Sequence, residues 1–270
     1  MSGMGRLAVI GGGRMGEAIV GGLLAADAVQ ADSIIVAEPN AARRGELAAV
    51  YGVAVVEDGV QAVAGADSVL VAVKPQIIDG VVAALAGAIA PGTLVVSIAA
   101  GITCARLESL LPADTPVVRV MPNTPALVGA GMAVISGGTE ATPAHVEAVR
   151  DAFAAIGEAV VLEERYQNAA SAISGSGPAY VALFVDALAR AGVREGLSRD
   201  VAQRLAVQTI RGTAELIDRT GQHPEAIVDA VTSPGGATIA AIAKLEEGGF
   251  RASIAAAVRA AVERSRELGS

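Results

Sequence analysis

The sequence predicts an α/β fold in which an N-terminal, doubly wound parallel sheet is followed by an all-α C-terminal region. In the first half of the chain, short apolar runs alternate with Ala-rich stretches long enough for helices, a pattern typical of a parallel sheet covered on both faces. After about residue 165 the strand-like runs stop, and only helical patterns follow. We therefore expect two domains, residues 1–165 and residues 166–270.

The expected strands are short runs rich in Val, Ile, Leu and Ala. Between them lie stretches that we interpret as helices, over 15–26, over 77–90 and from Pro143 onward. The strands of the parallel sheet are expected at 7–10, 33–37, 53–56, 69–73, 93–98 and 117–120, and 133–136 and 159–162 are expected to extend it.

The C-terminal domain is expected to contain only helices. The first of them has Pro178 at its expected first position, and apolar residues follow at three- and four-residue spacing. Gly248 and Gly249 end the third helix. The four expected helices span 178–191, 199–218, 237–247 and 251–268.

Composition excludes several functional classes. The chain has 270 residues, a formal net charge of −8 and only 2% aromatic residues, so it offers neither a basic groove nor a stacking surface for nucleic acid. With one cysteine, Cys104, and two distant histidines, a disulfide or a Cys/His metal site is not expected.

The N-terminal segment lacks the layout of a signal peptide. Residues 81–105 carry no charge, but Pro91 and Gly92 divide them, so we interpret them as a helix, a turn and a strand rather than as a membrane span. We expect a cytoplasmic protein without a membrane segment.

A glycine-rich loop follows the first expected strand. The sequence Gly11-Gly12-Gly13-Arg14-Met15-Gly16 has the G-x-G-x-x-G pattern and opens the first helix. In a Rossmann-type domain, the first glycine allows the tight turn, the second lets the backbone approach a pyrophosphate, and the third lets helix and strand pack closely. An ordinary strand–helix turn is the alternative, but the position of the loop favours dinucleotide binding by residues 1–165.

Glu38 ends the second expected strand, at the usual place for a carboxylate that binds the adenine ribose. A carboxylate there favours NADH, because it repels a 2′-phosphate. Arg43 and Arg44 follow closely and are either receptors for such a phosphate or solvated surface residues. These residues leave both NADH and NADPH as candidates.

The loops after the later strands are expected to form the coenzyme cleft, because ligands of such sheets lie at the carboxyl ends of the strands. Small residues after the fifth strand allow a flat nicotinamide ring to lie against the backbone. Lys74 is placed to face the ribose or the phosphates. The cleft residues are Ala72, Val73, Lys74 and Pro75, then Ala99 and Ala100, with the 121–125 loop beside them.

A second glycine-containing segment, TSPGGAT at 232–238, precedes a C-terminal helix. Unpaired N–H groups at 236–238 would attract a carboxylate, and Thr238 offers a hydroxyl at the same point. Ordinary helix capping is the alternative reading of this segment. In SGSGPAY, at 174–180, the glycines permit close packing and the serines are expected to cap the next helix.

Taken together and in this order, the motifs resemble those of the pyrroline-5-carboxylate reductase family nearly from end to end. TSPGGAT is the segment most specific to that family. The motifs are the glycine loop, AVKPQ (72–76), SIAAGIT (97–103), MPNTP (121–125), SGSGPAY, TSPGGAT and LEEGGFRASI (245–254). The chain departs from the family at Gly59 and Ala230, where many or some relatives carry Asn.

The resemblance implies reduction of the cyclic imine L-Δ1-pyrroline-5-carboxylate to L-proline with NADPH or NADH, the last step of proline biosynthesis. It implies that Thr238 donates a hydrogen bond or proton to the ring nitrogen and that Glu164 lies near the ring. The C-terminal helices would form a homodimer with the active site at its interface, and the dimers of the family often form decamers. The carboxylate would bind Ser233, Gly235, Gly236, Ala237 and Thr238.

Two other functions fit parts of the sequence. One is a dehydrogenase of the same superfamily that acts on a hydroxy acid or another cyclic imine. Hydroxy-acid oxidation in that superfamily uses a lysine in the helix joining the domains, and none lies between Lys74 and Lys244. The other is a non-catalytic dinucleotide sensor, in which the TSPGGAT segment would have no task.

Overall fold

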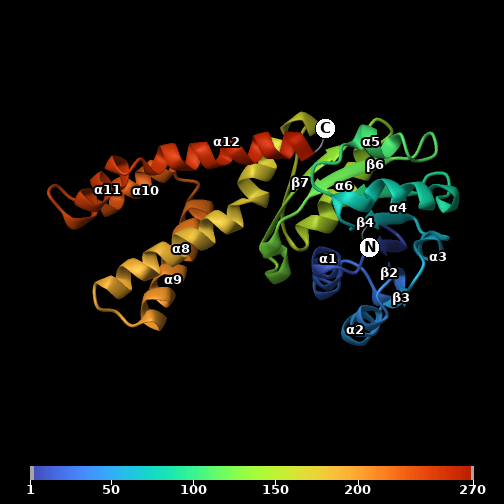
Figure 1. Cartoon of the computed structure of the whole chain (residues 1–270), viewed down its shortest axis with the longest axis horizontal. Helices are drawn as coiled ribbons and strands as arrows, with labels where there is room; N and C mark the ends of the chain where they lie inside the picture. Colours follow the sequence, from blue (N-terminus) through green and yellow to red (C-terminus); the bar gives the residue numbers. More distant parts are fainter. Residues whose placement is uncertain (1–2, 269–270) are drawn as a thin grey trace. The chain divides into compact units, whose positions relative to one another are not determined.

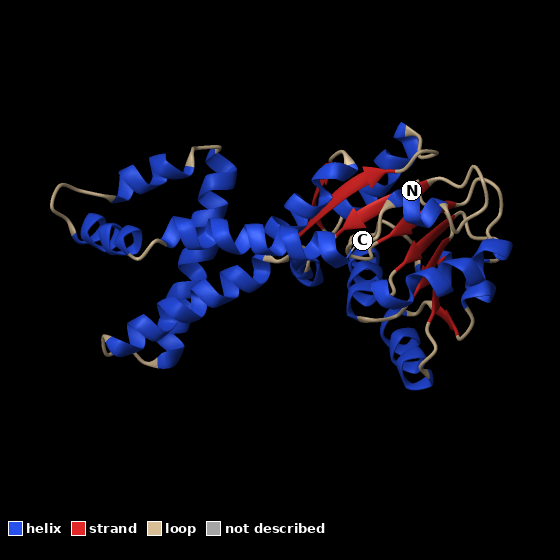
Figure 2. Cartoon of the chain, turned by 45° about the horizontal axis from the view of Figure 1, so that its top comes forward, coloured by secondary structure: helices blue, strands red, loops and turns tan. Residues whose placement is uncertain are grey.

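The computed structural model describes residues 3–268, so the outermost residues of the two predicted domains, 1–2 and 269–270, lie outside the described residues. The chain divides into two compact units, Met1–Ser176 with Ala261–Ser270 and Gly177–Ala260. All strands of the described chain belong to the first unit, and the second is helical (Figures 1 and 2). The α/β fold class predicted from the sequence is confirmed. The functional division at 165/166 stays a prediction.

The first unit is built on an eight-stranded sheet of order β3-β2-β1-β4-β5-β6-β7-β8. The strands from β3 to β6 run parallel, with the order reversing between β1 and β4. Every predicted strand is present. The strands are β1 (Leu7–Ile10), β2 (Ile34–Ala37), β3 (Ala54–Val56), β4 (Ser68–Val71), β5 (Leu94–Ser97), β6 (Val117–Met121), β7 (Gly131–Gly137) and β8 (Gly157–Val161).

Helices cover both faces of this sheet. Because side chains alternate along a strand, Leu7 and Val9 of β1 belong to one core cluster and Ala8 and Ile10 to the other. The first cluster is closed by α1 (Arg14–Ala25), α2 (Ala41–Tyr51) and α6 (Pro143–Ala154), and the second by α3 (Gly59–Val63), α4 (Ile78–Leu85) and α5 (Cys104–Glu108). This double covering explains why the strands are apolar on both faces.

The sheet differs from the expectation in one connection. β7 pairs with β6 in the antiparallel direction, while β8 pairs with β7 in the parallel direction. The chain passes from β6 to β7 through a short connection that holds the 3-10 helix Thr124–Val128, too short for the crossover helix that parallel pairing requires. Both strands extend the sheet as predicted.

The second unit consists of helices, the last of which continues into the first unit. The predicted helices are present with bounds shifted by at most a few residues, and α10 was not predicted. The helices are α8 (Gly177–Arg194), α9 (Arg199–Thr220), α10 (Pro224–Val231), α11 (Ala237–Glu247) and α12 (Phe250–Leu268).

Few apolar side chains of the second unit are buried. Its core cluster consists of Ala189, Ala202 and Ala206, with Val185 and Val193 packed against them. Larger apolar side chains lie on the surface, including Val181, Leu183, Phe184, Leu188, Leu205, Val231 and Ile254. Within the described residues, the stretch Glu164–Arg194 is long and apolar enough to cross a membrane by length and composition.

Candidate active site

The glycine loop lies between the end of β1 and the start of α1, and its glycines are required by close contacts. Gly11 has φ = 107°, and a Cβ there would lie 2.7 Å from the carbonyl oxygen of Ala72. A Cβ on Gly16 would collide with the carbonyl oxygen of Gly11. The structure therefore brings together Gly11, Gly16 and Ala72, all predicted from the sequence as coenzyme residues.

Gly13 serves a different purpose, because a Cβ built on it would meet nothing within 4 Å. It is the N-cap of α1 and, as a glycine, offers no side chain to accept a hydrogen bond from the first helix N–H groups. Within residues 3–268, the N–H groups of Gly13, Arg14, Met15 and Gly16 have no acceptor. An open glycine in front of unpaired helix N–H groups fits the pyrophosphate of a dinucleotide.

The predicted ribose carboxylate, Glu38, turns toward the glycine loop. Its Oε2 accepts from the Gly12 N–H at 3.0 Å, and its Oε1 accepts from the Asn40 N–H at 2.9 Å. Arg43 donates from Nε to the Gly12 carbonyl oxygen at 2.9 Å and pairs with Glu17. Arg44 donates to the Glu38 carbonyl oxygen at 3.0 Å and pairs with Glu57, so the reading of both arginines as freely solvated side chains is wrong.

The segments that follow β4 and β5 lie at the same edge of the sheet as the glycine loop. β4 pairs with both β1 and β5, so the segments after β4 and β5 leave the same edge of the sheet. Lys74 is exposed, and its ammonium group has no ion-pair partner among the described residues. Ala99 is buried, with its N–H on the hydroxyl of Ser97 at 3.3 Å, whereas Ala100 is exposed. Val73 and Pro75 flank Lys74.

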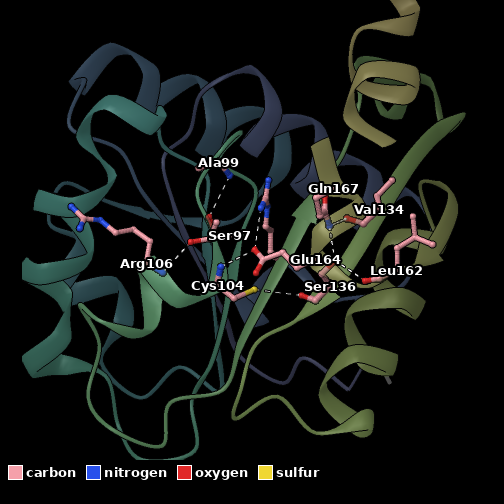
Figure 3. Close-up of polar contacts among 11 residues, drawn as sticks. Ser97, Ala99, Cys104, Arg106, Val134, Ser136, Leu162, Glu164 and Gln167 are labelled. Atoms are coloured by element: carbon pink, nitrogen blue, oxygen red, sulfur yellow. Dashed lines mark hydrogen bonds and ion pairs between the residues drawn. The ribbon is translucent and has the colours of Figure 1, made fainter. Parts of the chain in front are cut away.

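Glu164 lies next to the loop that follows β5. Its Oε1 accepts from the backbone N–H of Cys104, at the start of α5, at 2.8 Å (Figure 3). The same oxygen accepts from the guanidinium of Arg119 on β6 at 3.0 Å. Arg119 is buried, and Glu164 is partly exposed. The structure thus places the predicted substrate residue beside the SIAAGIT loop, where the nicotinamide is expected.

A polar network behind Glu164 was not predicted. Gln167, which is fully buried, donates from Nε2 to the Val134 carbonyl oxygen at 3.0 Å and to the Ser136 hydroxyl at 2.9 Å. Ser136 in turn donates to the Leu162 carbonyl oxygen at 2.7 Å (Figure 3). These bonds hold the segment around Glu164 against β7.

Asn123 of the MPNTP segment joins it to SGSGPAY. Its side chain donates to the Ser174 carbonyl oxygen at 3.0 Å and accepts from the Met132 N–H at 2.8 Å. A Cβ on Gly175 would lie 2.9 Å from the Met121 side chain, so this glycine permits close packing as expected. The expected capping role of the serines is wrong for Ser174, whose hydroxyl donates to the Ala170 carbonyl oxygen four residues earlier.

The thiol of Cys104 stays protonated, and therefore unreactive, at neutral pH in this setting. Burial, and then the neighbouring Glu164 carboxylate, raise the pKa of its thiol from the usual 9.0 to about 12. Between these two pH values the unfolded chain loses this proton while the folded chain keeps it. Stability therefore falls as the pH rises through this window.

We expect the free energy of unfolding to fall, through this thiol, by about 2 kcal/mol between pH 8 and about pH 10.5. Urea denaturation at both pH values measures the change. Cys104→Ala serves as the control, because it keeps the contribution of all other groups and should show a smaller fall. An equal fall in both proteins would contradict this account of Cys104.

The TSPGGAT segment lies in the second unit, between α10 and α11. Gly235 has φ = 68°, and the Gly236 N–H donates to the Ser233 carbonyl oxygen at 2.9 Å. The expectation of an unpaired N–H at 236 is therefore wrong, because the turn uses it. Within residues 3–268, the N–H groups of Ala237 and Thr238 have no acceptor, and the Thr238 side chain is exposed.

Comparison with known proteins covers both halves of the chain. Residues 164–268 match the family model described as "Pyrroline-5-carboxylate reductase dimerisation", and residues 6–101 match the model described as "NADP oxidoreductase coenzyme F420-dependent". Among curated proteins, pyrroline-5-carboxylate reductase of Synechocystis sp. is 48% identical, with 98% of each chain covered. That of Mycobacterium tuberculosis is 45% identical, with 98% of this chain and 97% of the relative covered.

Solved structures agree with these relatives. A pyrroline-5-carboxylate reductase of Coxiella burnetii superposes with a TM-score of 0.93 at 33% identity over 99% of each chain. The Plasmodium falciparum enzyme, solved with NADP bound, superposes with a TM-score of 0.90 at 31% identity over 100% of each chain. With both halves matched and relatives similar over nearly the full length, the chain belongs to the pyrroline-5-carboxylate reductase family.

Proposed function

We propose that this protein reduces L-Δ1-pyrroline-5-carboxylate to L-proline with NADPH or NADH, the last step of proline biosynthesis. The observation that carries the proposal is the pairing of two features. The glycine loop presents an open glycine and unpaired N–H groups for a dinucleotide, and the chain is 48% identical over nearly its full length to a reductase of that name.

The reaction needs a hydride at the imine carbon and a proton on the ring nitrogen. The bound coenzyme supplies the hydride. The protein must hold the imine against the nicotinamide, exclude water and favour the protonated imine, which is the more electrophilic form. Such a reaction asks for positioning more than for a strong acid or base.

Thr238 is proposed to donate a hydrogen bond or a proton to the ring nitrogen. Its hydroxyl is exposed and stands beside the N–H groups of Ala237 and Thr238, which have no acceptor among the described residues. The substrate carboxylate is proposed to bind these N–H groups together with Ser233, Gly235 and Gly236. In this role Gly236 contributes close approach rather than a hydrogen bond, because its own N–H is used by the turn.

Glu164 is proposed to face the ring. Arg119 and the Cys104 N–H both bind its Oε1, which fixes the side chain. A fixed carboxylate favours a nearby cation electrostatically. Glu164 therefore stabilises a protonated imine held above the SIAAGIT loop.

The experiment that tests this proposal follows the transferred hydride with an isotope label. The protein is incubated with the imine and, in separate reactions, with NADH and with NADPH that carry two deuterium atoms at nicotinamide C4, and the product is analysed by mass spectrometry and NMR. We expect L-proline with one deuterium on the ring carbon that was the imine carbon. Proline without the label would refute direct hydride transfer, and absence of proline with both coenzymes would refute the proposed reaction.

We also propose a homodimer, formed through the second unit, that completes the active site. Val181, Phe184 and Leu188 recur at helical spacing along α8 and are at least 38% exposed, a surface that a partner subunit would bury. The same burial accounts for the apolar stretch Glu164–Arg194 without a membrane. We place the protein in the cytoplasm, with further assembly to a decamer as the larger form.

We expect twice the monomer mass, or a multiple of it, in light scattering after gel filtration. Leu188→Lys should give a monomer, because it places a charge in the apolar stripe of α8. Arg190→Ala changes the opposite side of the same helix, about 200° away at 100° per residue, and should keep the wild-type mass. A wild-type monomer, or an oligomer unaffected by Leu188→Lys, would contradict the proposed interface.

A further inference from the structure

The adenine ribose is where the two candidate coenzymes differ, because only NADPH carries a phosphate on the ribose 2′ oxygen. In a doubly wound fold this ribose lies at the end of the second strand, beside the glycine loop. We propose that this protein prefers NADH and that Glu38 sets the preference. The inference rests on the proposed function only in taking the coenzyme to be a nicotinamide dinucleotide.

The carboxylate of Glu38 is fixed where the ribose is expected. Oε2 accepts from the N–H of Gly12, a buried residue of the loop, and Oε1 accepts from the N–H of Asn40, the N-cap of α2. Turning this side chain away would leave the Gly12 N–H unpaired inside the fold, which is unfavourable. A 2′-phosphate would therefore meet a carboxylate that is held in place.

Arg43, the first arginine after Glu38, is already engaged. Its guanidinium pairs with Glu17 of α1 and with Glu46 of its own helix, and Nε donates to the Gly12 carbonyl oxygen. Glu17 is held from its other side by the hydroxyl of Tyr51, which donates to it at 3.2 Å. Reaching a phosphate would cost Arg43 these bonds.

Arg44, the second cation, is engaged in the same way. It donates to the carbonyl oxygens of Glu38 and Pro39, at 3.0 and 2.9 Å, and pairs with Glu57 at 2.9 Å. Its side chain is only 22% exposed. The guanidinium therefore braces the turn after β2 instead of standing free in solvent.

The side chains around the end of β2 carry more negative than positive charge, which is unfavourable for a phosphate. Four carboxylates, those of Glu17, Glu38, Glu46 and Glu57, face the guanidinium groups of Arg43 and Arg44, which leaves a formal charge of −2, or −1 when the exposed Arg14 of the glycine loop is counted as well. The 2′-hydroxyl of NADH can donate to Glu38, whereas the phosphate of NADPH can only be repelled by it. This excess of negative charge at the end of β2 therefore favours NADH, the coenzyme without the phosphate.

The test measures coenzyme binding directly, without the imine. The full-length protein is titrated with NADH and with NADPH while the nicotinamide fluorescence is followed. We expect Kd for NADPH to exceed Kd for NADH by about tenfold or more, as like charges brought together weaken binding. An equal or lower Kd for NADPH would overturn the proposal, whatever the turnover of the imine.

Three variants assign the preference to Glu38. Glu38→Gln removes the charge and should lower the Kd ratio of NADPH to NADH by about tenfold. Glu38→Asp keeps the charge and should keep the preference even if both coenzymes bind less tightly. Glu147→Gln, the same change in α6 where Glu147 pairs with Arg150, should leave the ratio unchanged. A ratio that does not respond to Glu38→Gln would overturn the role of Glu38.

Discussion

Replacing Thr238 with Ala is expected to lower kcat by about 10²-fold or more, the contribution typical of a positioned proton donor. The hydroxyl is exposed and makes no hydrogen bond to any residue between 3 and 268, so the fold does not require it. The loss should therefore appear in turnover rather than in stability. Steady-state kinetics with saturating coenzyme and the melting temperature measure the two quantities separately.

Two variants sharpen this test. Thr238→Ser keeps a hydroxyl and should retain most of the activity. Thr232→Ala removes a hydroxyl from the same segment that donates to the Asp229 carbonyl oxygen, and it should affect stability more than kcat. A Thr238→Ala protein with wild-type kcat and KM would refute the role of Thr238.

Replacing Gly13 with Ala is expected to weaken coenzyme binding by about 5- to 150-fold, the effect of forcing one methyl group into a tight contact. In the protein alone the methyl group meets nothing within 4 Å, and Gly13 has φ = −68°, which Ala adopts freely. The variant should therefore fold and fail only when a pyrophosphate approaches. Kd from fluorescence titration, together with the melting temperature, checks both parts.

The matched control is Gly80→Ala. Gly80 lies in α4, and a Cβ there also meets nothing within 4 Å. This variant should bind the coenzyme as the wild type does, with equal or slightly higher stability. A Gly13→Ala protein with unchanged Kd would mean that the coenzyme does not approach the loop at this glycine.

The sheet and the glycine loop could be predicted because local pattern determines them. A strand buried on both faces is apolar at every position, and a turn that packs Gly11 and Gly16 against neighbouring backbone admits no other residue. The antiparallel direction of β7 was not predicted because strand composition does not record direction; the signal was the short connection from β6 to β7, which leaves no room for a crossover helix.

The partners of the site residues were harder to predict, because they are distant in sequence. Arg119 and Glu164 lie 45 positions apart and meet only once β6 and the segment after β8 are placed. A single charged residue inside the apolar strand VVRVM was the one signal that a buried ion pair was required. The arginines after β2 likewise looked free, because their partners, Glu17 in α1 and Glu57 between β3 and α3, lie elsewhere in the sequence.

The N–H of Gly236 shows a further limit of sequence analysis. The segment correctly suggested a helix start with unpaired N–H groups, and Ala237 begins α11. The tight turn at Gly235 nevertheless closes a hydrogen bond from Gly236 to Ser233, which residue types alone did not indicate. Two donors remain, at Ala237 and Thr238, and they suffice for one carboxylate.

The most direct test of this account is the rate of coenzyme oxidation at 340 nm with L-Δ1-pyrroline-5-carboxylate as the only other substrate. We predict turnover on the order of 1–10³ s⁻¹, the usual range for enzymes, with one L-proline formed for each coenzyme oxidised. A folded oligomer that binds NADH or NADPH but oxidises neither in the presence of this imine would contradict the assignment.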